Sequence, residues 1–185
     1  MIGSKTTTAF RVNSDIDLLG DLMNAIETKE KLVKTETYEK SHSVLFVCTG
    51  NTCRSPMAEA VYNFYAKKYD LNTRAFSAGV AANGSRMSAH ARTALLEAGY
   101  IDEDYEFVSR QVTEELCRDA DAVIGLTEAH AMRLIMAFPE HATKIRALSH
   151  DISDPFGGYL ERYKECLSEI AQAVHDEFFD GYGNE

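Results

Sequence analysis

The chain has 185 residues, of which 45% are hydrophobic, and this suits one globular domain with a sizeable core. Its formal net charge of −10 argues against nucleic acid and anionic membranes as partners. The N-terminus lacks a signal-peptide pattern and no apolar run reaches membrane-spanning length, so we expect a cytoplasmic protein. The four cysteines include no CxxC pair and are expected to be free thiols; no metal site or cofactor is predicted.

Residues 1–42 are predicted to form an N-terminal extension that precedes a domain at 43–185. Apolar residues recur on one helical face from Ser14 onward, and Ser14 and Asp17 are placed as a capping box. The extension is therefore expected to contain one amphipathic helix. Residues 14–40 either cover apolar surface of the chain or mediate self-association or partner binding.

An apolar strand, a tight loop and the start of a helix follow one another after the extension. Residues 44–47 are all apolar, which is typical of a strand that is buried on both faces. Gly50 and Asn51 tolerate a left-handed backbone, so the chain can turn sharply there. Ser55 before Pro56 predicts a helix N-cap followed by proline at the first helical position.

The residues of this loop predict a phosphate-binding site with a nucleophile. Backbone N–H groups of a curled loop, together with a helix N-terminus, attract an anion. Arg54 can hold two phosphoryl oxygens, and the same positive field favours the thiolate of Cys48. Ser55 can donate a hydrogen bond to that sulfur. The predicted phosphate-binding residues are Thr49, Gly50, Asn51, Thr52, Cys53, Arg54 and Ser55.

The remaining elements alternate between strands and helices. We expect strands at 74–80, 120–126 and 144–148, and helices at 88–98, after Thr113, at 128–137 and at 160–178. This alternation predicts an α/β fold with a parallel sheet. The site should lie beyond the carboxyl ends of the strands, where Cys48 is placed.

A carboxylate is needed to protonate the leaving group and then to activate water. Asp154 begins an Asp-Pro-Phe-Gly-Gly loop, in which proline fixes the backbone and the glycines permit a close approach to the site. By pattern alone an Asp-Pro pair is usually only a turn. Asp151 is a nearby competitor that lacks the following proline.

The string Cys48-Thr-Gly-Asn-Thr-Cys-Arg-Ser-Pro resembles the active-site loop of the low-molecular-weight protein tyrosine phosphatases, a family that includes bacterial protein-arginine phosphatases. The resemblance covers about residues 43–179. It implies a three-layer fold with a four-stranded parallel sheet of order 2-1-3-4, flanked by helices. It also implies a phosphocysteine intermediate, Asp154 as the general acid, and a network that links Asn51 to the Ser55 hydroxyl and to a later histidine, which His90 matches.

Two positions bear on the substrate. Family tyrosine phosphatases typically carry an apolar branched residue where this chain has Thr52, and a tyrosine-rich stretch where Phe156 precedes two glycines. The chain therefore resembles the arginine phosphatases more closely. A polar wall at Thr52 can accept hydrogen bonds from a guanidinium, and Asp154 offers a countercharge. Phosphorylated protein is the expected substrate, with phosphotyrosine as the alternative to phospho-arginine.

Two other classes share the motif. Arsenate reductases have this fold, but a match would require a pair of downstream redox cysteines, and Cys117 stands alone in its region. A non-catalytic phosphate-binding module is the other alternative. Cys53 is expected to be either a small buried apolar residue or a thiol that reversibly protects Cys48 as a disulfide.

Overall fold

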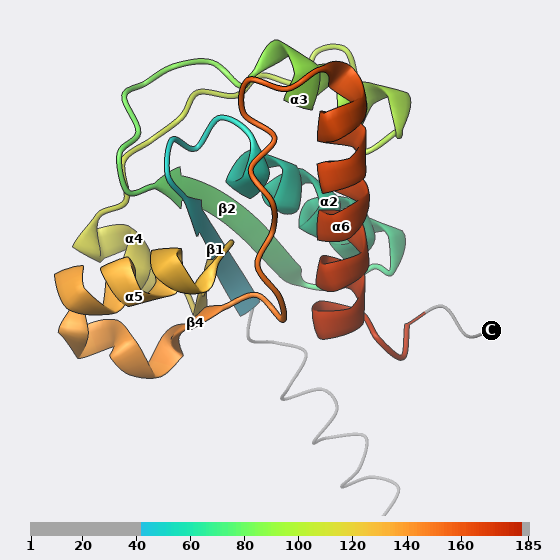
Figure 1. Ribbon diagram of the computed structural model, residues 1–185. Coiled ribbons are helices and arrows are strands. Elements are labelled where there is room, and N and C mark those ends of the chain that lie inside the picture. Colours follow the sequence, from blue (N-terminus) through green and yellow to red (C-terminus); the bar gives the residue numbers. More distant parts are fainter. Residues whose placement is uncertain (1–41, 183–185) are drawn as a thin grey trace, which may run out of the picture. The chain divides into compact units, whose positions relative to one another are not determined.

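The computed structural model describes residues 42–182, and the predicted helix from Ser14 lies outside them. One parallel four-stranded sheet forms the centre of the domain, in the order β2-β1-β3-β4 (Figure 1). Its strands are β1 (His42–Cys48), β2 (Thr73–Gly79), β3 (Ala122–Gly125) and β4 (Ile145–Ala147). The predicted α/β class and the strand order implied by the family resemblance are confirmed.

Helices cover both faces of the sheet (Figure 1). Along β1, Val44, Phe46 and Cys48 belong to one apolar cluster, and Leu45 and Val47 belong to the other. This alternation explains why the strand is apolar at every position from 44 to 47. The first cluster contains residues of α2 (Arg54–Lys68), α3 (Ala89–Glu97) and α6 (Leu160–Phe178), and the second contains residues of α4 (Glu114–Asp119) and α5 (Glu128–Ala137).

Local signals placed most helix ends correctly. The side chains of Thr113 and Thr127 accept hydrogen bonds from the first turns of α4 and α5, as N-caps do. The expectation that Ser55 caps α2 is wrong, because α2 begins at Arg54 and Ser55 lies inside the helix, with its hydroxyl beside Cys48. A 3₁₀ helix at Pro139–Lys144 was not predicted.

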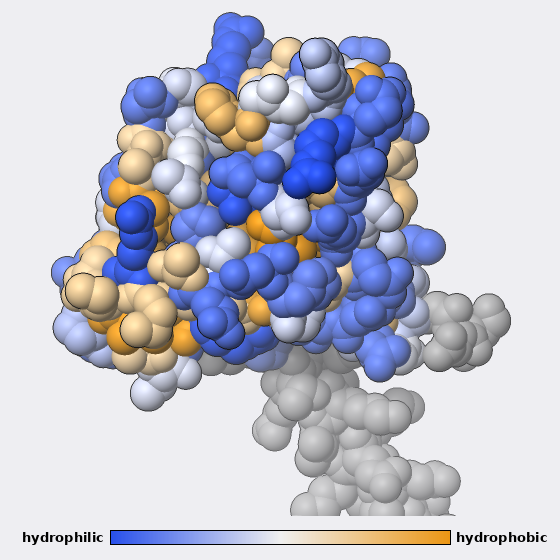
Figure 2. Space-filling view, viewed as in Figure 1, coloured by the Kyte–Doolittle hydropathy of each residue, from blue (hydrophilic) through white to orange (hydrophobic). Residues whose placement is uncertain are grey.

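The molecular surface is largely hydrophilic on the face shown in Figure 2, in keeping with the charged composition. Apolar residues gather on this face over α4 and α5 (Figure 2), and Met132 and Met136 of α5 are exposed. Within residues 42–182, no helix is both long and apolar enough to span a membrane.

Candidate active site

The loop between β1 and α2 curls around the end of the sheet with Cys48 at its base. Cys48 is buried, and its Sγ lies 3.0 Å from the Ser55 Oγ. Asn51 adopts φ = 53°, the left-handed conformation expected of it. The amides of Val80 and Ala81 donate hydrogen bonds to the carbonyls of Cys48 and Thr49, so the segment after β2 holds the loop.

Gly79, the last residue of β2, packs directly against this loop. A Cβ atom at Gly79 would lie 2.6 Å from the Thr49 carbonyl oxygen and 2.9 Å from the Asn51 nitrogen. Any side chain there would displace the loop backbone. The glycine therefore permits the tight curve of the loop around Cys48. Gly79 was not among the predicted site residues.

Asn51 is the centre of a buried hydrogen-bond network. Its Nδ2 donates to Ser55 Oγ at 2.9 Å and to Ser77 Oγ at 2.8 Å, and its Oδ1 accepts from the Arg110 amide at 2.9 Å. Ser77 Oγ in turn donates to Glu59 Oε2 at 2.6 Å. Both N–H groups of Asn51 are directed at hydroxyl oxygens, so the Ser55 proton is left for the Cys48 sulfur or for the Ala78 carbonyl oxygen, which lies 3.3 Å from Ser55 Oγ.

The predicted hydrogen-bond network of Asn51, Ser55 and His90 is wrong for His90. The structure does not bring His90 to Asn51, and Ser77 occupies the third place in the network. His90 Nδ1 lies 3.2 Å from the Gly158 carbonyl oxygen, and its ring packs against Tyr163 at a centroid distance of 5.4 Å. His90 therefore supports the loop that carries Asp154.

Arg54 and Asp154 meet above the loop. Arg54 is buried, and its Nη2 contacts Asp154 Oδ2 at 2.6 Å while its Nη1 donates to the Ile152 carbonyl at 3.3 Å. The Phe156 amide donates to Asp154 Oδ1 at 3.2 Å, which fixes the carboxylate at the start of its turn. The side chain of Asp154 remains 53% exposed, so it can be reached by substrate and by water.

Asp151, the competing carboxylate, has a different position. Its Oδ1 accepts a hydrogen bond of 2.7 Å from the Glu128 amide in the first turn of α5. A carboxylate at a helix N-terminus stabilises the helix. Asp151 thus supports the fold, whereas Asp154 lines the same pocket as Cys48.

A pocket of about 260 Å³ opens above Cys48. It brings together most of the predicted site residues, and Phe156, which is 77% exposed, lies at its mouth. Thr52 forms part of the wall. The lining residues are Cys48, Thr49, Gly50, Thr52, Cys53, Arg54, Asp154 and Phe156.

His130 of α5 was missed in the sequence. Its Nε2 lies 3.0 Å from Thr49 Oγ1, and its Nδ1 lies 2.8 Å from Thr127 Oγ1. Burial, together with the positive charges of Arg54 and Arg133, lowers the pKa of His130 to about 4. The ring is therefore neutral at physiological pH and holds a hydroxyl of the phosphate-binding loop.

All four cysteines are buried free thiols. Cys53 donates to the Tyr163 hydroxyl at a distance of 3.6 Å and packs in the core. Burial raises the pKa of Cys117 to about 11 and that of Cys166 to about 12, so both are unreactive near neutral pH. Cys117 lies in the apolar cluster on the opposite face of the sheet from Cys48.

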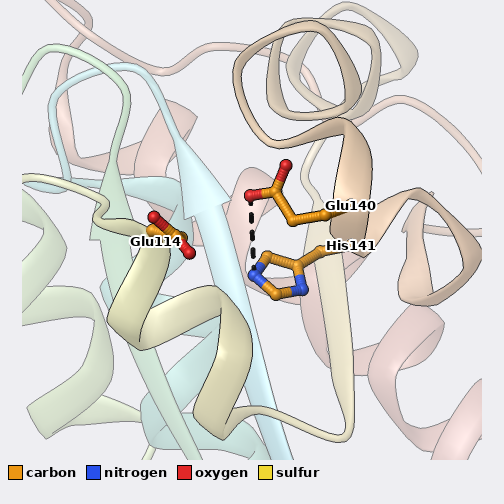
Figure 3. A group of neighbouring side chains, drawn as sticks. All are labelled: Glu114, Glu140 and His141. Carbon is orange, nitrogen blue, oxygen red and sulfur yellow. Dashed lines mark ion pairs between the residues drawn. The ribbon is translucent and has the colours of Figure 1, made fainter.

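One cluster of possible metal ligands lies apart from this site, between α4 and the 3₁₀ helix (Figure 3). Ligand atoms of Glu114, Glu140 and His141 fall within 4.8 Å of one another. Both carboxylates are exposed, and His141 Nε2 is paired with Glu140 Oε1 at 3.7 Å. Exposed acidic groups of this kind are common without an ion, and the cluster is not assigned a function.

Comparison with known proteins places this geometry in context. The family model described as low molecular weight phosphotyrosine protein phosphatase matches residues 43–179. A protein-arginine-phosphatase of Bacillus subtilis is 39% identical over 139 residues, which cover 71% of this chain and 91% of that protein. A low molecular weight protein-tyrosine-phosphatase of Streptomyces coelicolor is 32% identical, covering 72% of this chain and 89% of that protein. An arsenate reductase of Brevibacillus brevis is 31% identical, covering 69% of this chain and 97% of that protein.

Solved structures agree with the sequence comparison. A crystal structure of a YwlE variant from Bacillus subtilis matches with a TM-score of 0.69 and 37% identity, covering 72% of this chain and 94% of that chain. A YwlE arginine phosphatase variant with a phosphorylated active-site serine matches with a TM-score of 0.67 and 34% identity, covering 75% of this chain and 98% of that chain. The second structure records a phosphoryl group bound covalently at the active site of a similar protein.

Proposed function

The chain belongs to the low molecular weight phosphotyrosine protein phosphatase family, and we propose that it hydrolyses phospho-arginine on proteins through a phosphocysteine intermediate. Cys48 is the nucleophile, Arg54 and the loop amides bind the phosphoryl oxygens, and Asp154 is the general acid and base. The observation that carries the choice of substrate is that Thr52 and Asp154 line one pocket above Cys48.

In the first step, the Cys48 thiolate attacks phosphorus and the bond from phosphorus to the leaving nitrogen breaks. Asp154 gives its proton to that nitrogen, so the arginine side chain leaves without a build-up of negative charge. Arg54 and the positive end of α2 stabilise the charge on the transferring phosphoryl oxygens. Burial of Arg54 strengthens this interaction because little water competes for the guanidinium.

In the second step, the carboxylate of Asp154 removes a proton from water, and the resulting nucleophile attacks the phosphocysteine. The bond between sulfur and phosphorus breaks, phosphate leaves and the thiolate of Cys48 returns. Ser55 can donate a hydrogen bond to the departing sulfur, since their heavy atoms are 3.0 Å apart. One carboxylate thus serves both half-reactions, which removes the need for a second acid.

Substrate preference follows from the chemistry of the pocket wall. The Thr52 hydroxyl can accept an N–H hydrogen bond that a guanidinium offers and a phenol ring does not. The Asp154 carboxyl, which holds the proton for the leaving nitrogen, can also accept a guanidinium N–H hydrogen bond at its carbonyl oxygen. An apolar wall would favour an aromatic ring, because burying an unpaired guanidinium N–H costs free energy.

Matched peptides that carry phospho-arginine or phosphotyrosine test this proposal. We expect a higher kcat/KM for phospho-arginine, and Thr52→Ile should shift the preference toward phosphotyrosine by about tenfold or more, because it removes a substrate-facing hydroxyl. Thr73→Val, which changes a threonine at the start of β2, is the matched control. An unchanged ratio in Thr52→Ile would contradict the assignment.

Tyrosine phosphatase activity is the second candidate. It is favoured by the exposed ring of Phe156 at the pocket mouth, which can stack on a phenyl group. Arsenate reduction is less well supported, although an arsenate reductase is among the relatives. It would need a relay of cysteines, whereas Cys117 packs on the far face of the sheet.

We infer that the protein acts in the cytoplasm, because its nucleophile must stay reduced and all four cysteines are free thiols. The family acts on phosphorylated proteins, so the direct partner is a phosphorylated protein substrate. Self-association through residues 14–40 stays a prediction, because those residues lie outside the described part of the chain.

A further inference from the structure

A second cavity lies between α2 and the segment of residues 99–105. Its volume is about 660 Å³, within the usual range of small-molecule sites and larger than the pocket above Cys48. The catalytic mechanism assigns it no role. Its walls combine apolar and aromatic surface with charged side chains from α2 and from residues 102 and 104.

The cavity walls have the chemistry of an organic-cation site. Phe64, Tyr100 and Tyr105 supply aromatic surface, and the rings of Phe64 and Tyr100 meet edge to face at a centroid distance of 5.1 Å. Glu59 and Asp102 contribute carboxylates to the same lining. Carboxylates and aromatic faces together attract ammonium and guanidinium groups.

Two lysines at the end of α2 also border the cavity. The Lys68 ammonium lies over the rings of Tyr65 and Tyr69, at 5.9 and 5.4 Å from their centroids. The three carboxylates of Glu59, Asp102 and Asp104 outnumber the two ammonium groups of Lys67 and Lys68 in the cavity lining.

Glu59 connects the cavity to the nucleophile. Its Oε2 accepts from Ser77, whose oxygen accepts from Asn51, and Asn51 also donates to Ser55 beside Cys48. Each heavy-atom distance along this series of hydrogen bonds is 3.0 Å or shorter. The carboxylate of Glu59, at one end of the series, thus lines the cavity, and the sulfur of Cys48, at the other end, is the proposed nucleophile.

We propose that this cavity is a regulatory site for a small organic cation, an ammonium or guanidinium group on an aromatic or apolar body, and that Glu59 transmits its occupancy to Cys48. An ionised carboxylate is only an acceptor, so it fixes the Ser77 proton toward Glu59. Both Asn51 N–H groups then point at hydroxyl oxygens, which leaves the Ser55 proton to the Ala78 carbonyl oxygen at 3.3 Å or to the Cys48 sulfur at 3.0 Å. An ionised Cys48 is the stronger acceptor of the two, because a charged acceptor strengthens a hydrogen bond.

A cation in the cavity strengthens this arrangement. Burial raises the pKa of Glu59, although the Ser77 hydrogen bond and the charge of Arg110 oppose the rise. A bound cation stabilises the ionised carboxylate and so holds the network in the direction that supports the thiolate. The other charged or titratable groups around the cavity are Lys67, Lys68, Tyr100, Asp102, Asp104 and Tyr105.

Binding is tested on the full chain with benzylammonium chloride, after saturation of the active site with inorganic phosphate. We expect the backbone amide signals of Asn63 and Tyr105 to shift in NMR spectra. Benzyl alcohol, the neutral counterpart, should bind at least about tenfold more weakly, since it lacks the charge. Glu59→Gln should weaken the binding of benzylammonium by a similar factor. Glu97→Gln, on the exposed surface of α3, is the matched control. Equal affinity for benzylammonium and benzyl alcohol, or NMR shifts confined to residues 48–54, would contradict the proposed cation site.

Coupling is tested by kcat for p-nitrophenyl phosphate with and without the cation. The rate measurement rests on the proposed phosphatase function, whereas the binding measurement does not, so the two can fail separately. We expect benzylammonium to raise kcat about fivefold in the unmodified protein, at the low end of allosteric couplings. Ser77→Ala should still bind the cation but show a rate ratio near one.

Binding without a rate change, or an undiminished rate change in Ser77→Ala, would refute the coupling. If Ser77→Ala does not fold, Glu59→Gln replaces it, because the substitution is isosteric and a melting curve reports its folding. Glu59→Gln should then lose the activation by benzylammonium, and activation that persists in this variant would refute the proposal.

Discussion

Gly79→Ala gives the most direct test of how the fold shapes the active-site loop. The new methyl carbon would lie 2.6 Å from the Thr49 carbonyl oxygen and 2.9 Å from the Asn51 nitrogen. Carbon needs about 3.5 Å from its neighbours, so the loop must move by roughly 0.5–1 Å. Overpacking of this kind costs about 1–3 kcal/mol of stability. A misplacement of about 1 Å near reacting groups can lower the rate by about 100-fold.

We therefore expect Gly79→Ala to lower kcat for p-nitrophenyl phosphate by about 10- to 100-fold and to weaken inhibition by inorganic phosphate. Steady-state kinetics and urea unfolding measure both effects. Gly99→Ala is the control, because a Cβ there meets nothing within 4 Å although φ is +75°. It should lose about 1 kcal/mol of stability from backbone strain and keep its kcat. A Gly79→Ala protein with kcat within twofold of the original would refute the reasoning.

Three further outcomes are expected. Asp154→Ala should slow both chemical steps and let a phosphate adduct accumulate on Cys48, as intact-mass spectrometry can detect; an unchanged rate would remove Asp154 from the mechanism. Asp151→Ala should instead cost about 1 kcal/mol of stability, by loss of its hydrogen bond at the N-terminus of α5, with kcat retained. For His130, the folded pKa is about 4 and the ordinary value is 6.5, so only the unfolded chain takes up a proton between these values. The stability that His130 contributes is thus complete above pH 6.5 and is lost as pH falls toward 4, by up to about 3 kcal/mol. Urea unfolding of His130→Asn should show a flatter dependence in this window, and an equally steep one would contradict the assignment.

The parts of the fold and the site that depend on neighbours in sequence could be predicted. The strand and the left-handed Asn51 are encoded within a dozen residues, and the structure has both, whereas α2 begins one residue before the predicted Ser55 cap. The predicted bounds of α5 and α6 are also those observed, because both helices carry clear apolar periodicity. The strand order came from the family resemblance, since periodicity gives no order.

The parts that depend on sheet register could not be predicted. Gly79 reaches the loop because β2 pairs in parallel with β1, which sets Gly79 opposite Cys48. His130 reaches Thr49 across 81 positions of sequence. A glycine at the end of a strand and a histidine in the first turn of a helix are ordinary features of a sequence. Their roles arise only when the carboxyl ends of the strands meet at one edge.

The displacement of His90 by Ser77 shows why a positional match does not decide a hydrogen-bond network. Asn51 has two N–H donors, and Ser55 and Ser77 accept both of them. Asn51 Oδ1 accepts from the Arg110 amide at 2.9 Å, and His90 instead has its Nδ1 3.2 Å from the Gly158 carbonyl oxygen. The two N–H donors of Asn51 are therefore used by serines, and the hydrogen-bond network ends on the carboxylate of Glu59. Because a carboxylate carries a charge that a ligand can change, this ending makes the support of the nucleophile open to control from the far side of α2.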